Sequence, residues 1–283
     1  MTLATLADVL QPALRGGYAV AGLVCLGWED MRAYAMAAEA EGAPVILQAG
    51  PGCRKHTPLP VLGAMLRYLA ESASVPVVVH LDHGNCLEEC RQAIEAGFTS
   101  VMFDGSRKSL QQNIDETAAV VELAHRAGIS CEGEIGFVGY AGGDASAGTD
   151  PDEAATFAKA TGVDAMAISI GNVHLERAAA APIDEQRLAA IEAVTSLPLV
   201  IHGGSGVPRV QRASLASVTN ICKFNIGTEL RIAFGVALRE AVGADPQRFD
   251  RIAILRETED PVMNASRLII RELFGQDRRS SGS

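Results

Sequence analysis

The stretch from 75 to 84 reads Val-Pro-Val-Val-Val-His-Leu-Asp-His-Gly, an apolar run that ends in three ionisable side chains. The run does not alternate with polar residues, which is typical of a parallel strand buried on both faces. Seven further short apolar, β-branched runs recur along the chain, and several of them are likewise continuous. The eight expected strands are Tyr18–Cys25, Pro44–Ala49, Val75–His80, Thr99–Phe103, Ile129–Glu134, Ala165–Ile170, Leu197–Ile201 and Ile221–Asn225.

Amphipathic segments with helical spacing lie between these runs, and a glycine follows several of them where a helix should end. The clearest of these segments are Asp30–Glu41, Leu59–Ser72, Leu87–Ala96, Leu110–Ala127 and Asp184–Thr195. Eight strand–helix units in 283 residues predict a (β/α)8 TIM barrel, an α/β fold. A doubly wound open sheet is the alternative.

The chain shows no linker rich in proline or serine, so we expect 1–283 to form a single barrel domain. Extra C-terminal helices should form an extension from about 229, and the tail 278–283 should be disordered. The longest loop, 137–150, contains four glycines and is expected to be a mobile lid or binding loop.

The net charge of −10 makes a broad nucleic-acid surface improbable, because such surfaces need clustered cations. No apolar stretch is long enough to cross a membrane, and the N-terminus lacks the pattern of a signal peptide. Six sparse cysteines without CxxC spacing fit reduced thiols in the cytoplasm. A small anionic substrate stays compatible with this charge, because backbone amides at a helix start can bind it.

Ionisable residues gather just after the expected strands, at the end of a barrel that hosts active sites. His83, His174 and His202 follow three different strands and should meet at this face. Three protein ligands and one open position are typical of catalytic zinc. His80 lies before its strand end, and a core role or a supporting role fits it equally well.

The loops after the last two expected strands suit a phosphate, since barrels often bind phosphate there with loop amides and a helix N-terminus. They contain Gly203, Gly204 and Ser205 in one case and Asn225, Ile226, Gly227 and Thr228 in the other. Asp82, next to a candidate ligand, suits proton transfer to or from a substrate hydroxyl. It could instead orient a histidine.

Arg54 and Lys55 follow the second expected strand. They could bind a second anionic group of a substrate. A pair of solvated loop charges explains them equally well.

These motifs together resemble those of the class II, zinc-dependent ketose-bisphosphate aldolases, especially the fructose- and tagatose-bisphosphate branch. The resemblance extends from Arg15-Gly16-Gly17-Tyr18 to the segment 223–230. Leu81-Asp82-His83 and Ile201-His202-Gly203-Gly204-Ser205-Gly206 are its most specific parts. The family fold is a (β/α)8 barrel.

The resemblance implies an aldehyde-lyase that reversibly cleaves a phosphorylated ketose to dihydroxyacetone phosphate and an aldehyde through a metal-stabilised enediolate. His83, His174 and His202 would bind Zn²⁺, and Asp82 would be the acid/base at the aldol hydroxyl. Asp104 and Glu134 match positions that can hold a second, displaced metal, and a monovalent cation is a further option. Gly203–Ser205 and Asn225–Thr228 would bind dihydroxyacetone phosphate, and the protein would be a homodimer or homotetramer.

Three departures from the family pattern affect the expected substrate. Leu175 replaces a glycine that helps to bind phosphate, and Val24 replaces an asparagine. The loop 137–150 lacks the family's glutamate, for which Asp144 is a candidate substitute. These changes favour a related phosphorylated ketose or a keto-acid derivative over plain fructose bisphosphate. Two alternatives stay open: a catalytically altered sugar-phosphate-binding or partner-supporting subunit, and a metal-dependent epimerase.

Overall fold

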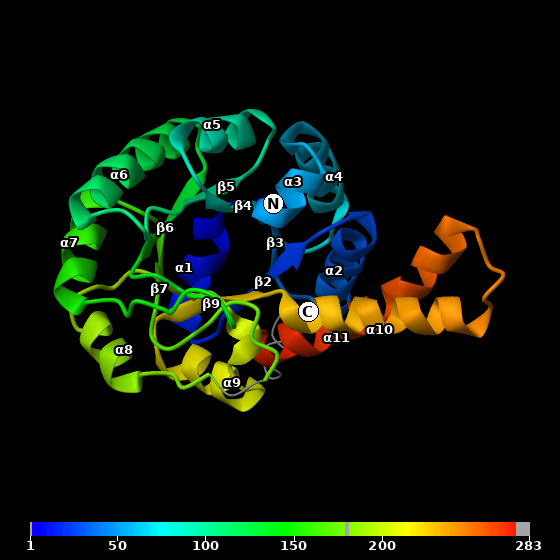
Figure 1. Ribbon diagram of the computed structural model, residues 1–283. Coiled ribbons are helices and arrows are strands. Elements are labelled where there is room, and N and C mark those ends of the chain that lie inside the picture. Colours follow the sequence, from blue (N-terminus) through cyan, green and yellow to red (C-terminus); the bar gives the residue numbers. More distant parts are fainter. Residues whose placement is uncertain (1, 179–180, 276–283) are drawn as a thin grey trace.

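Eight parallel strands close into a barrel in the computed structural model, which describes residues 2–178 and 181–275 (Figure 1). Each strand pairs with the next along the chain, and the last pairs with the first to close the cylinder. The prediction of a (β/α)8 barrel is therefore confirmed, and the open sheet is wrong. The barrel strands are β2 (Val20–Cys25), β3 (Val45–Ala49), β4 (Val77–Gly84), β5 (Ser100–Phe103), β6 (Ser130–Ile135), β7 (Ala165–Ile168), β8 (Leu199–Ile201) and β9 (Ile221–Ile226).

Helices surround the barrel in the order that the amphipathic segments predicted. Glycines in the left-handed conformation end several of them, for example Gly42 after α2 and Gly162 after α7. The helices of the outer ring are α2 (Trp28–Glu41), α3 (Pro51–His56), α4 (Leu59–Ser72), α5 (Leu87–Glu95), α6 (Leu110–Arg126), α7 (Pro151–Thr161), α8 (Glu185–Glu192) and α9 (Arg209–Val218).

The N-terminal segment, for which no structure was predicted, closes one end of the barrel. It forms the short strand β1 (Leu3–Ala4), paired with β4, and helix α1 (Leu6–Gly16). Leu6, Val9, Leu10 and Ala13 of α1 are buried against residues at the N-terminal ends of the barrel strands, such as Val20. Because this end is plugged by apolar side chains, the opposite mouth is left for a polar site.

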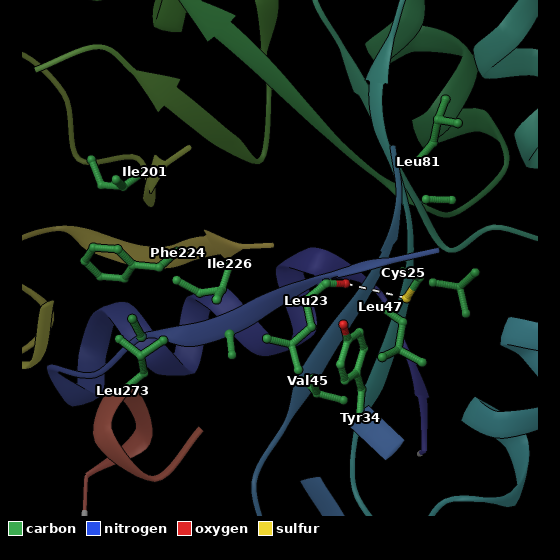
Figure 2. Close-up of a cluster of buried hydrophobic side chains, with 14 of the residues drawn as sticks. Leu23, Cys25, Tyr34, Val45, Leu47, Leu81, Ile201, Phe224, Ile226 and Leu273 are labelled. Carbon is green, nitrogen blue, oxygen red and sulfur yellow. Dashed lines mark hydrogen bonds between the residues drawn. The ribbon is translucent and has the colours of Figure 1, made fainter. Parts of the chain in front are cut away.

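The main core lies between the barrel wall and the helices. Figure 2 shows Leu23, Leu47 and Phe224 of the strands beside Tyr34 of α2 and Leu273 of the last helix, all fully or almost fully buried. Apolar burial of this extent is the main source of stability in such a fold.

Two further helices follow β9, as the sequence predicted for the chain beyond about 229. They are α10 (Thr228–Ala244) and α11 (Arg251–Phe274), and part of this pair projects from the barrel as an arm (Figure 1). Helix α11 packs along α2, where Arg267 and Arg271 donate hydrogen bonds to the carboxylate of Glu41. The predicted disordered tail, 278–283, lies outside the described residues. Within the described ranges, none of the helices has the length and apolar character that a membrane span requires.

Candidate active site

A pocket of about 250 Å³ lies at the C-terminal mouth of the barrel. Strand β4 reaches it with Asp82 and His83, because the strand runs to Gly84 instead of ending at His80 as predicted. The pairing of β4 with β5 shifts register between Leu81 and Gly84, and His83 has a left-handed φ of 53°. Successive residues of a regular strand point to opposite faces, and this irregularity explains why Asp82 and His83 both reach the pocket.

The three predicted histidines converge at this mouth. One ring nitrogen from each of His83, His174 and His202 lies within 4.8 Å of the others. Nε2 of His83 and Nδ1 of His202 are 3.1 Å apart. A tetrahedral zinc ion with bonds of about 2.0–2.1 Å would separate two ligand nitrogens by about 3.3 Å. The geometry therefore fits a shared metal ion.

The other ring nitrogen of two of these histidines forms a hydrogen bond to a carboxylate. Nδ1 of His83 donates to Asp104 at 2.7 Å, and Nε2 of His202 donates to Glu132 at 3.0 Å. These bonds leave Nε2 of His83 and Nδ1 of His202 turned toward one another at the mouth, where a bound metal ion would take the place of a proton shared between the two rings.

The electrostatics of the mouth also favour a cation. Burial by itself lowers the pKa of His83, but the carboxylates of Asp82, Asp104 and Glu134 outweigh it and raise the pKa to about 10. Burial, followed by the nearby charge of Asp104, raises the pKa of Glu134 to about 8. Oε2 of Glu134 is buried and has no hydrogen-bond partner among the described residues. His83, Asp104 and Glu134 form a second group that could hold a metal ion.

Asp82 lines the pocket and is buried. Burial opposes its ionisation, but the neighbouring His83 and His202 outweigh that effect and lower its pKa. Its Oδ1 accepts a hydrogen bond from Nδ2 of Asn225 at 3.2 Å. Asp82 is thus held as a carboxylate that can accept a proton within the pocket.

The predicted phosphate loops reach the same pocket as α3, and most of their residues line it. Gly203, Ser205, Asn225, Gly227 and Thr228 line the pocket. Helix α10 begins at Thr228 at the mouth, and the hydroxyl of Ser205 accepts the backbone N–H groups of Gly227 at 3.3 Å and of Glu229 at 3.4 Å. These features are those of an anion site at a helix N-terminus.

Four predicted binding residues and the candidate lid carboxylate do not line the pocket. Gly204 packs under β9, and the side chain of Ile226 is buried in the core. Neither Arg54 nor Lys55 is among the pocket residues. Asp144 is exposed and forms an ion pair with Arg107.

Tyr140 of the loop 137–150 is a site residue that the motifs did not indicate. Its ring stacks on His174 with 4.8 Å between ring centroids, and it lines the pocket. The loop is hydrogen-bonded to the segment after β7: His174 N–H donates to Gly139 O at 2.8 Å, and Ala141 N–H donates to His174 O at 2.9 Å. The tyrosine thus covers one face of a candidate ligand.

A buried polar network under the histidines was also missed. Lys223 donates to Oε2 of Glu132 at 2.6 Å and to Nε2 of His80 at 3.3 Å, and all three side chains are fully buried. His80 in turn bonds Ser100 through Nδ1. Burial, followed by the charge of Lys223, lowers the pKa of His80 to about 3. His80 is therefore a neutral interior residue that supports this network.

Comparison with known proteins agrees with this geometry. Residues 4–278 match the family model described as fructose-bisphosphate aldolase class-II. The chain belongs to the class-II fructose-bisphosphate aldolase family.

Several relatives of this family cover nearly the whole chain. A fructose-bisphosphate aldolase of Geobacillus stearothermophilus is 36% identical over 271 residues, which cover 93% of each chain. A probable fructose-bisphosphate aldolase of Bacillus subtilis strain 168 is 37% identical, over 88% of this chain and 90% of the relative. The crystal structure of the YdjI aldolase from Escherichia coli K12 has a TM-score of 0.84 and 31% identity, and the match covers 96% of this chain and 97% of that one.

Proposed function

We propose that this class II aldolase binds a divalent metal ion, Zn²⁺, through His83, His174 and His202, and reversibly cleaves a ketose phosphate to dihydroxyacetone phosphate and an aldehyde. The main support is the convergence of three histidine nitrogens within 4.8 Å beside an ionised, buried carboxylate. Asp104 and Glu134 are the proposed ligands of a second or displaced ion. Their carboxylates also offset the positive charge of the metal ion at the three histidines.

The protein groups divide the remaining work. Asp82 takes the proton of the C4 hydroxyl as the bond between C3 and C4 breaks, and returns it in the reverse direction. Asn225 keeps Asp82 oriented through their hydrogen bond. Gly203, Ser205 and the first amides of α10 bind the phosphate of the triose. When bound, the metal ion supplies Lewis-acid stabilisation of the negative charge that develops on the ketone oxygen.

The far end of the substrate has a different candidate site from the one expected at Arg54 and Lys55. A groove of about 730 Å³ adjoins the pocket through Leu175, Thr228 and Arg231, and Arg177 and Arg239 also line it. Within residues 2–178 and 181–275, no ion pair involves any of these three arginines. Uncompensated guanidinium groups suit an anion, so we propose that the ketose has a second anionic group.

The charge of the groove can be tested separately. Arg239→Gln should raise KM for a ketose bisphosphate about tenfold or more, because one charged hydrogen bond contributes about 1.5–3 kcal/mol. It should leave KM for the 1-phosphate analogue unchanged, because that analogue lacks the second anionic group. Arg126→Gln, on the outer face of α6, is the matched control. Equal effects of Arg239→Gln on both substrates would contradict the distal site.

The reaction itself requires a direct assay. Metal content is measured first, and release of dihydroxyacetone phosphate from a panel of ketose phosphates is then followed with and without a chelator. Chelator-sensitive release is expected. Stoichiometric metal without triose release would contradict the aldolase and would favour an epimerase or a sugar-phosphate-binding subunit.

We also propose that the chain works as one barrel domain in a homodimer or homotetramer, in the cytoplasm. The projecting arm supports an oligomer, because it exposes large apolar side chains: Val242, Phe249 and Ile252. Its test is the molar mass in solution of the wild type and of Phe249→Ser. The six cysteines are all free thiols, as expected in a reducing compartment.

A further inference from the structure

Arg54 of α3 does not face the pocket, yet it is bonded to the backbone beneath two of the proposed site residues. Its Nη1 donates to the carbonyl of Asp82 at 2.6 Å, and its Nη2 donates to the carbonyl of His83 at 2.9 Å. Nη1 also donates to the carbonyl of Ala49 at 2.7 Å, at the end of β3. One planar guanidinium thus joins the ends of two neighbouring strands.

The carbonyls of Asp82 and His83 lie where the regular pairing of β4 with β5 is interrupted. The register between β4 and β5 shifts after Leu81. His83 has a φ of 53°, a backbone conformation that residues other than glycine rarely adopt. Such a residue keeps its conformation only when surrounding contacts enforce it. Arg54 supplies two of these contacts, one to the carbonyl of the peptide before His83 and one to the carbonyl of the peptide after it.

The arginine is itself held in place. Its side chain is 5% exposed, and Nε donates to Oε1 of Glu89 at 2.8 Å. The other oxygen of Glu89 accepts the backbone N–H of Asn85 at 2.9 Å, in the turn between β4 and α5. Glu89 therefore links Arg54 to the segment that immediately follows the proposed ligand.

We propose that Arg54 is a positioning residue, which holds the end of β4 so that His83 presents its nitrogen to the metal ion and Asp82 presents its carboxylate to the substrate. Lysine cannot replace it, because a single ammonium group cannot span three carbonyls with the geometry of a planar fork. The inference rests on the proposed metal site at His83.

Cobalt(II) provides a test that does not depend on catalysis. Metal-free wild type, Arg54→Lys and Arg54→Ala are titrated with Co²⁺ in competition with a chelator, and the visible spectrum of the bound ion reports its ligand geometry. We expect affinity to fall about 10–100-fold in Arg54→Lys, as for other residues that orient metal ligands, and to fall further in Arg54→Ala. At saturating metal, kcat should fall while KM for the ketose phosphate stays constant.

The controls separate positioning from general stability. Arg91→Ala and Arg91→Lys alter an exposed arginine on α5 that pairs with Glu88 and Glu95, and they should leave Co²⁺ affinity unchanged. Near-ultraviolet circular dichroism confirms folding. If Arg54→Ala does not fold, Arg54→Lys and Glu89→Gln decide the question.

Folded Arg54→Lys with wild-type Co²⁺ affinity, spectrum and kcat would overturn the inference. A rise in KM without a loss of affinity would do the same, because it would point to substrate binding. If the wild type itself binds no Co²⁺, the proposed metal site fails instead.

Discussion

Nε2 of His202 donates a 3.0 Å hydrogen bond to Oε1 of Glu132, and both side chains are fully buried. This contact determines which nitrogen of His202 keeps its lone pair for the mouth of the barrel. The same carboxylate accepts a hydrogen bond from Lys223 through its other oxygen. One buried glutamate therefore orients a proposed metal ligand and neutralises a buried ammonium group.

Glu132→Gln should weaken both functions. An amide NH₂ facing Lys223 would leave that ammonium group without its counter-charge, and we expect the free energy of unfolding to fall by about 3–5 kcal/mol. Affinity for Zn²⁺, measured by chelator competition, should fall about 10–100-fold because His202 loses its charged acceptor. Glu122→Gln, which removes an exposed partner of Arg126, is the control. Unchanged zinc affinity in Glu132→Gln would contradict this role.

Leu175 has a left-handed φ of 58° at the boundary between the pocket and the arginine groove. This conformation costs a side chain about 1–2 kcal/mol, and glycine avoids that cost but adds about 0.5–1 kcal/mol of chain entropy. Leu175→Gly should therefore raise the free energy of unfolding by up to about 1.5 kcal/mol, as measured in urea. Leu175→Ala keeps the strain and should gain nothing. If both variants behave alike, the left-handed backbone is not a source of strain.

The barrel and the histidine cluster were predictable because both depend on short-range patterns. Several of the buried strands are continuous apolar segments, and a strand end fixes the face on which the following histidine lies. Arg54 was not predictable in the same way: a cation after a strand can bind a ligand or carbonyl groups, and only the fold brings Ala49, Asp82 and His83 around it. The arginine groove likewise joins distant segments, and helix α1 plugs the barrel through contacts that no local motif indicates.

Asp30 should make stability depend on pH. Burial raises its pKa to about 6, although backbone N–H groups of Leu26 and Gly27 donate to it and oppose the shift. The unfolded chain has an aspartate pKa of about 3.9, so between these values the folded state binds more protons. This group's contribution to the free energy of unfolding is therefore present below about pH 4 and is lost as pH rises through about 6.

Asp30→Asn should remove this contribution to the pH dependence of the free energy of unfolding. From pH 4 to pH 7, the wild type should therefore lose stability relative to the variant. Asn also has one oxygen fewer to accept the backbone N–H groups before α2. The resulting loss in free energy of unfolding is the same at every pH. Asp184→Asn should show the opposite trend, because hydrogen bonds from Arg187 lower the pKa of Asp184. Parallel pH profiles for Asp30→Asn and wild type would rule out the titration.

Gly203 should tolerate no side chain. Its φ is 63°, and an added Cβ would lie 2.2 Å from the carbonyl oxygen of Val173, which belongs to the segment leading to His174. Gly203→Ala must therefore move either the phosphate loop or the segment that bears a proposed ligand, and the free energy of unfolding should fall by at least about 1 kcal/mol. We expect inorganic phosphate to raise the melting temperature of the wild type and to have no such effect on Gly203→Ala. Gly243→Ala, near the end of α10 with no atom within 4 Å of the added carbon, should instead stabilise the protein slightly and keep the phosphate response. Retention of that response by Gly203→Ala would place phosphate elsewhere in the barrel mouth.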